Sequence, residues 1–69
     1  MKWYNTELEK KHADKLIEYL KEKNVKFEPS QAGHLTHIEI YTDPATVRTI
    51  NNKIDDITRA IVWKRITQL

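Results

Sequence analysis

Two histidines three positions apart, His34 and His37, are the residues of this chain whose spacing first suggests chemistry. Such a pair can supply two ligands to a zinc site, which needs three or four ligands that converge. His37 falls in a stretch that alternates like a β-strand, where residues an odd number of positions apart point to opposite faces. The chain has no cysteine, and no clustered carboxylates complete a ligand set. We therefore expect no metal and interpret both histidines as turn and surface residues.

The other residue types that catalyse reactions are poorly placed for catalysis. Asp55 and Asp56 are adjacent, and on a helix adjacent side chains splay by about 100°, so the two carboxyls cannot share a proton. Ser30, the only serine, follows a proline and lacks the strained glycine-flanked turn of a nucleophile. One glycine, Gly33, is too few for a phosphate-binding loop. We expect no enzyme and no cofactor, also because so short a chain has little room for a pocket.

Aromatic residues give the strongest remaining signal. Six large rings occur in 69 residues: Trp3, Tyr4, Tyr19, Phe27, Tyr41 and Trp63. We expect Phe27 in the core and Tyr19 at the rim of a helix. Tyr41, Trp63 and one of Trp3 or Tyr4 are expected on the sheet face away from the helices. A sheet face of that composition is rarely left uncovered.

This face predicts association with protein. Tryptophan, tyrosine and arginine are the usual anchors of protein interfaces. The residues expected to bind a partner are Tyr41, Trp63, Arg65, His37 and Trp3. We expect a small non-enzymatic protein-binding or regulatory module with an aromatic and basic sheet face, acting as a homodimer. Folding of Trp63 back onto its own core is the alternative.

A second hypothesis is binding of single-stranded nucleic acid. No acid follows Asp56, whereas three cations do: Arg59, Lys64 and Arg65. Bases would stack on the rings beside these cations. However, Glu39 would repel phosphate, and its strand lacks the glycine–aromatic signature of RNA-recognition domains. Protein association therefore ranks first, and an ordinary solvated surface remains a third interpretation of the cations.

The composition indicates a compartment and a size class. Absence of cysteine fits a reducing interior. No apolar run approaches the roughly 20 residues of a membrane span, and no signal peptide opens the chain. We expect a cytoplasmic protein without membrane contact, of the kind that bacteria, their mobile elements and phages encode. Residues 1–69 make one small domain.

Residues 25–42 have the pattern of a β-hairpin around which the other elements must pack. Ile38 and Ile40 share one face with the threonines at 36 and 42, while His37 and Tyr41 point to the other. Gly33 supplies the positive φ of the turn. Pro29 cannot donate a ladder hydrogen bond, so its strand should lie at the sheet edge.

Two helices are predicted around this hairpin. After a short strand over 1–4, Thr6 and Glu9 match a capping box, and apolar spacing predicts a helix over 7–23. Asn24 suits the left-handed position that ends it. Asp43 and Pro44 then open a second helix, whose apolar stripe is Val47, Ile50, Ile54 and Ile57.

Residues 59–69 are rich in β-branched residues, and the helical stripe fails beyond Ile61. We favour a fourth strand there over a helix. The resulting order β-α-β-β-α-β resembles the ferredoxin-like plait, an α+β fold with strand order 4-1-3-2 and both helices on one face. The alternative is an α-β-β-α arrangement with a long C-terminal helix.

Overall fold

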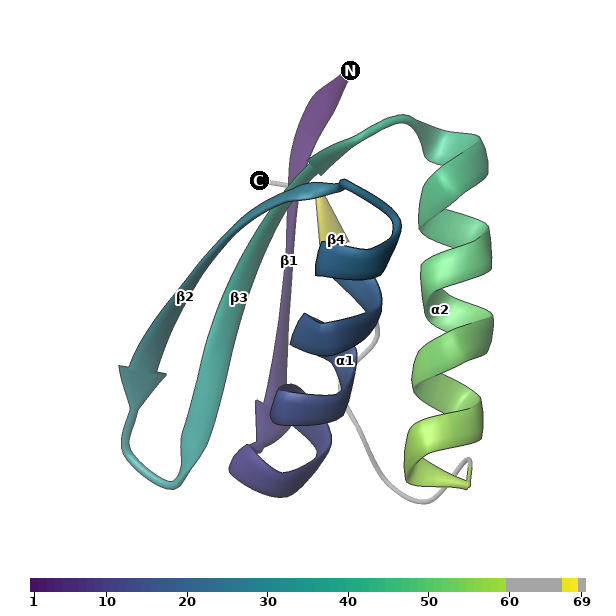
Figure 1. Cartoon of the computed structure of the whole chain (residues 1–69). Helices are drawn as coiled ribbons and strands as arrows, with labels where there is room; N and C mark the ends of the chain where they lie inside the picture. The colour runs from purple at the N-terminus through teal and green to yellow at the C-terminus, as the bar shows by residue number, and fades with distance from the viewer. Residues whose placement is uncertain (60–66, 69) are drawn as a thin grey trace.

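The structure is a computed structural model that describes residues 1–59 and 67–68. Its elements, in chain order, are β1 (Lys2–Glu9), α1 (Lys10–Glu22), β2 (Lys26–Ala32), β3 (Leu35–Thr42), α2 (Pro44–Thr58) and the two-residue β4 (Thr67–Gln68). The strands lie in the order β2-β3-β1-β4, and all neighbours are antiparallel. Three long strands and two helices confirm the predicted α+β class (Figure 1).

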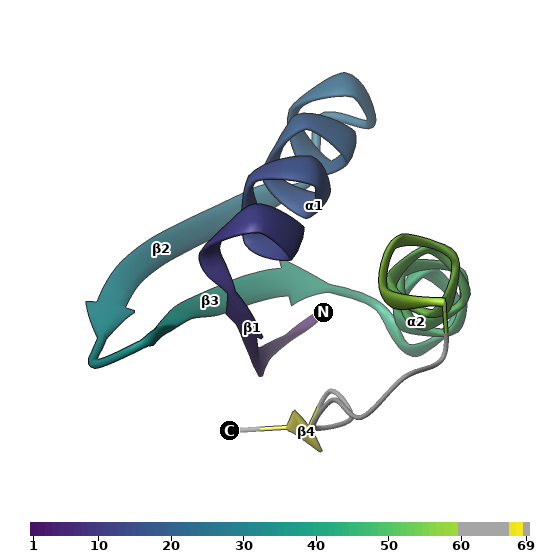
Figure 2. The same cartoon turned by 90° about the horizontal axis from the view of Figure 1, so that it is seen from below.

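Both helices lie on the same side of the sheet, as the end-on view in Figure 2 shows. The core fills the space between the two layers. It consists of Leu8 from β1, Ala13, Leu16 and Leu20 from α1, Ile38 and Ile40 from β3, and Ile50 and Ile54 from α2. Within the described residues, neither helix has the length and hydrophobicity that a bilayer crossing requires.

The hairpin prediction is confirmed. β2 and β3 pair up to Ala32 and Leu35, which leaves Gly33 and His34 as a two-residue turn. Gly33 has φ +64°, as expected for the first central position of such a turn. β2 is the edge strand of the sheet, where Pro29 costs no ladder hydrogen bond with a further strand. The isoleucines of β3 point to the core, and His37 and Tyr41 lie on the other face.

The predicted capping box is wrong, and so is the early helix start. β1 extends to Glu9, and α1 begins only at Lys10, with no side-chain hydrogen bond at its N-cap. Thr6 is buried in the strand opposite Ile38, and Leu8 lies opposite Thr36. Leu8 fits a helical period with α1 and also a strand period with Tyr4 and Thr6. Pairing along all of β3 favours the strand, because it satisfies the backbone and buries these three side chains together.

Two other predicted helix termini, the end of α1 and the start of α2, are confirmed. Asn24 adopts φ 57°, its N–H donates to the Lys21 carbonyl, and the Val25 N–H donates to the Leu20 carbonyl. This is the Schellman pattern that ends a helix with a left-handed residue. At the start of α2, the Asp43 carboxylate accepts a hydrogen bond from the Thr46 N–H at 2.7 Å, and Pro44 is the first helical residue.

Helix α2 ends at Thr58, and Arg59 follows in the left-handed conformation with φ 58°. Thr67 and Gln68 pair with Asn5 and Tyr4 of β1. The alternative of an uninterrupted C-terminal helix is therefore wrong. Most of the strand expected over 59–69 lies outside the described residues, so the full ferredoxin-like plait stays a prediction.

Candidate functional site

The sheet face opposite the helices, called the open face below, carries the site. At one end of it, Lys26 of β2, Tyr41 of β3 and Trp3 of β1 lie side by side in the strand register, and we call these three the aromatic row. The ring centroids of Trp3 and Tyr41 are 5.1 Å apart at an interplanar angle of 48°. The Lys26 Nζ lies 5.6 Å from the Trp3 ring and 5.9 Å from the Tyr41 ring.

These distances describe a preorganised group of side chains. Tilted ring pairs at this separation attract each other, and an ammonium over two ring faces adds a cation–π contribution. Trp3 and Tyr41 are both half-buried. Their strand neighbours Tyr4 and Ile40 point to the other face, into the core. The aromatic row thus presents two ring surfaces and a cation to whatever meets the open face.

Carboxylates follow in the next rows. Glu28, Glu39 and Asn5 are aligned across the three strands, then Ser30, His37 and Glu7, then Ala32, Leu35 and Glu9. Glu28 and Glu39 are directly opposite each other, and like charges in that position destabilise a sheet. No ion pair within the described part of the chain compensates these two carboxylates. An approaching cation or hydrogen-bond donor would relieve their repulsion.

An apolar residue lies at the far end of the open face. Leu35 is 36% exposed, and with Met1 it is one of two large hydrophobic residues found exposed among those described. Along β3, the open face therefore runs from an aromatic residue through an acid and a histidine to a leucine.

The structure brings together some of the residues that the sequence suggested. Trp3 and Tyr41 are in contact, and His37 is on the same face, four positions and about 13 Å from Tyr41. Arg59 is exposed at the C-terminal end of α2. Trp63, Lys64 and Arg65 lie outside the described residues. No three His, Asp or Glu side chains in the described ranges are grouped to hold a metal ion.

Sequence reasoning missed two members of the site, Lys26 and Glu28. The alternation in 25–28 placed both residues opposite Phe27, which is the correct face. Their neighbours could not be derived from that alternation, because the contacts of Lys26 with the two rings and of Glu28 with Glu39 depend on the pairing register of three strands.

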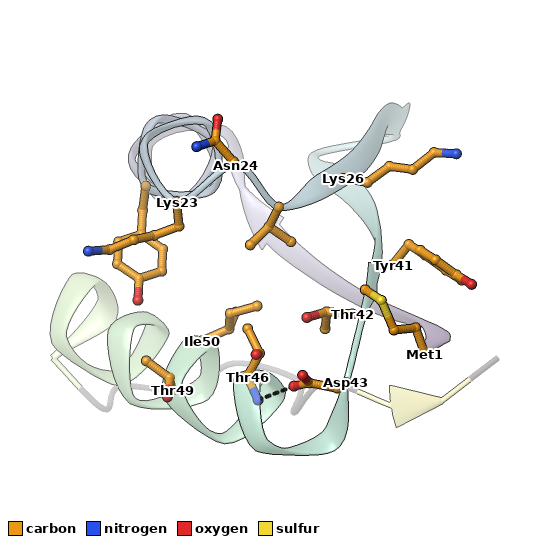
Figure 3. A pocket seen from close by; sticks show the side chains of 12 residues that line it. Met1, Lys23, Asn24, Lys26, Tyr41, Thr42, Asp43, Thr46, Thr49 and Ile50 are labelled. Atoms are coloured by element: carbon orange, nitrogen blue, oxygen red, sulfur yellow. Dashed lines mark hydrogen bonds between the residues drawn. The ribbon is translucent and has the colours of Figure 1, made fainter.

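A cleft of about 540 Å³ opens beside the aromatic row, between the end of α1 and the start of α2 (Figure 3). Lys26 and Tyr41 line both the cleft and the open face. Val25 and Ile50 form apolar lining, and Thr42, only 4% exposed, contributes to the wall. The cleft therefore continues the open face toward the helices and has the volume of a pocket for a small molecule or a large side chain.

Asp43 places a fixed negative charge in this cleft. Hydrogen bonds from the Thr46 side chain and backbone N–H hold the pKa of the Asp43 carboxyl below its ordinary value of 3.8. The carboxylate thus caps α2 and is ionised at neutral pH, which leaves it unsuited to donate a proton there.

Comparison with protein-family models finds no match for this chain. The same holds for comparison with curated proteins and with solved structures. The site described above therefore rests on the geometry of this chain alone.

Proposed function

We propose that this chain is a small non-enzymatic protein-binding module that receives its partner on the open face. The observation that supports this is the aromatic row, where two ring surfaces and an ammonium are held together on the side of the sheet opposite the two described helices. Aromatic side chains with few rotamers lose little entropy on contact, which is why they dominate the affinity of protein interfaces.

The arrangement also fits a protein partner better than a nucleic acid. Stacked bases would bring phosphates next to Glu28 and Glu39, which are in the row adjacent to the rings. A polypeptide can instead offer a donor to these carboxylates and an apolar side chain to the rings or to the neighbouring cleft. Binding of single-stranded nucleic acid through Arg59, Lys64 and Arg65 is the second-ranked hypothesis.

A site-specific photo-crosslinker tests the proposed function in the cells that make the protein. We expect Tyr41→p-benzoylphenylalanine, on the open face, to capture a protein on irradiation. The matched control is Lys15→p-benzoylphenylalanine, which carries the same group on the exposed side of α1 and should capture nothing specific. Equal capture from both positions, or none from position 41, would refute the proposal.

The proposed partner surface extends over a fourth strand. Residues 59–69 would continue the pairing of Thr67–Gln68 along β1 and complete a ferredoxin-like plait, with Trp63 and Arg65 added to the open face. Backbone chemical shifts test this, because extended residues and helical residues shift their Cα signals in opposite directions. Helical shifts over 60–66 would contradict the fourth strand.

A further inference from the structure

The open-face side chains of β3 form a sequence that is complementary to its own reverse. In order they are Leu35, His37, Glu39 and Tyr41. If a second copy lies antiparallel over the first, Leu35 faces Tyr41 of the other copy and His37 faces Glu39. The apolar Leu35 then meets the aromatic Tyr41, and the carboxylate of Glu39 meets the imidazole of His37. Interfaces around a two-fold axis require this kind of self-complementarity.

We propose that the partner on the open face is a second copy of this chain, packed sheet on sheet with its β3 antiparallel to the first. This proposal rests on the proposed function, since it uses the same face and specifies its occupant. Aligned sheets pack about 10 Å apart at an angle near 30°. The His37 and Glu39 pairs lie next to the two-fold axis, where this rotation displaces side chains least.

Charge complementarity selects this register among the alternatives. A shift by one row places either Glu39 on Glu39 or His37 on His37. A parallel arrangement of the two β3 strands also places Glu39 on Glu39. Only the antiparallel register that is centred between His37 and Glu39 brings an imidazole to each central carboxylate. The imidazole of the second copy also approaches Glu28, the carboxylate paired with Glu39 in the sheet.

The flanking strands are compatible with the same register. Over β2, Glu28 faces Ser30 and Lys26 faces Ala32 of the other copy. Over β1, Asn5 faces Glu7, and Trp3 faces Glu9, in line with the row assignments. No carboxylate faces another carboxylate in this arrangement. Like charges that face each other across an interface are strongly unfavourable, so their avoidance on all three strands favours this packing.

A charge-swap series tests the proposal by sedimentation velocity over a wide range of protein concentration. We expect wild-type dimers. His37→Glu should raise the dissociation constant at least about tenfold, because it places a carboxylate over Glu39 twice. Glu39→His should weaken the dimer likewise by pairing imidazoles. The double variant His37→Glu/Glu39→His restores both pairs in reversed order and should recover most of the affinity.

The double variant also serves as the internal control for folding. Glu7 of β1 and Ser30 of β2 flank His37 in the sheet, and Glu9 and Glu28 lie diagonally from it. A glutamate at position 37 meets Glu7 in the single and the double variant alike, whereas the double variant also removes the Glu28–Glu39 pair, so the folding stability of each variant is measured separately by urea titration. Circular dichroism checks that both variants fold, so that a difference in affinity between them reports the contact between copies.

The outcomes separate this proposal from the proposed function. A wild-type monomer at millimolar concentration, together with capture of a different protein from position 41, refutes the second copy and leaves the open face as the binding surface. A dimer that all variants leave unchanged uses another surface and refutes this proposal. Failure of the double variant to recover affinity refutes the register. A wild-type monomer together with no capture from position 41 refutes both the second copy and the proposed function.

Discussion

Arg59 ends helix α2 in a backbone conformation that arginine adopts at a cost. It has φ 58° and ψ 36°, and its N–H donates to the Asp55 carbonyl. The left-handed conformation is unfavourable by roughly 1–2 kcal/mol for a residue with a Cβ, and glycine avoids this strain. We predict that Arg59→Gly raises the free energy of unfolding by about 1 kcal/mol, measured with urea. Arg59→Asn should gain less, and a loss in the glycine variant would contradict the geometry.

The same variant separates the two binding hypotheses. Arg59 is one of the three cations that the nucleic-acid hypothesis requires, and it is exposed. Because carboxylates border the rings, we predict no retardation of single-stranded oligonucleotides in a gel at low ionic strength. A shift that weakens steeply with salt, as counterion release demands, and that falls in the more stable Arg59→Gly would reverse our ranking.

Asp43 gives a pH dependence whose sign follows from its hydrogen bonds. Bonds from Thr46 lower the pKa of this carboxyl in the folded chain below 3.8. The stabilisation is therefore fully present above the unfolded pKa and is lost as the pH falls through the lowered folded pKa. Asp43→Asn keeps an acceptor for the Thr46 N–H and does not ionise. We predict that wild type exceeds this variant in unfolding free energy at neutral pH and loses that advantage in acid. A pH-independent difference would contradict the assignment.

At the scale of single elements, the end of α1 offers a clean test of the Schellman motif. Asn24 holds the left-handed position with φ 57°, followed by the hydrogen bond from the Val25 N–H to the Leu20 carbonyl at 2.9 Å. We predict that Asn24→Ala lowers the free energy of unfolding by about 1 kcal/mol, since a Cβ without a local hydrogen-bonding group is strained there. Asn24→Gly should equal or exceed wild type in the same urea titration. Equal stability of the alanine variant would refute the motif.

Elements whose signals come from one local rule were predictable here. The hairpin followed from alternation and Gly33, and the start of α2 followed from Asp43 and Pro44. β1 was predicted too short because Thr6 and Glu9 also match a capping box. Two local rules competed over the same residues, and the choice was made by pairing with β3, a contact more than 25 residues away in the chain. Such long-range pairing is not encoded in a short window.

The composition of the site was predictable only in part, for a related reason. Alternation placed Tyr41 and His37 on one face of their strand but left open whether Trp3 or Tyr4 shares that face, and the strand register selects Trp3. The opposition of Glu28 and Glu39, and the position of Lys26 over both rings, appear only once the strands are in register. The sequence therefore suggested a basic face, whereas the described part of that face carries four glutamates and Lys26.

At the scale of the whole molecule, the core is small, so association between chains can add substantially to the free energy of unfolding. Stability of about 0.05–0.15 kcal/mol per residue gives roughly 3–10 kcal/mol for a chain of this length. The two described helices cover one sheet face, whereas the open-face side chains of β1 and β3 are mostly only half-buried and can gain burial by association. Three strands about 26 Å long give a modest interface, for which we expect dissociation in the micromolar range.

A thermal prediction follows, because a partner that binds only the folded chain stabilises it by mass action. Raising the total protein concentration from the dissociation constant to about a thousandfold above it should add roughly 2 kcal/mol. For a domain of this size, 1 kcal/mol corresponds to a rise of about 4–8 °C in Tm. We therefore predict that the Tm of wild type increases by several degrees over this range, measured by calorimetry. His37→Glu should show a smaller rise in Tm over the same range, because its dissociation constant is at least about tenfold higher. The double variant His37→Glu/Glu39→His should regain the concentration dependence even if its Tm is lower throughout. A wild-type Tm that stays constant up to millimolar protein would show that association between copies does not stabilise the folded chain.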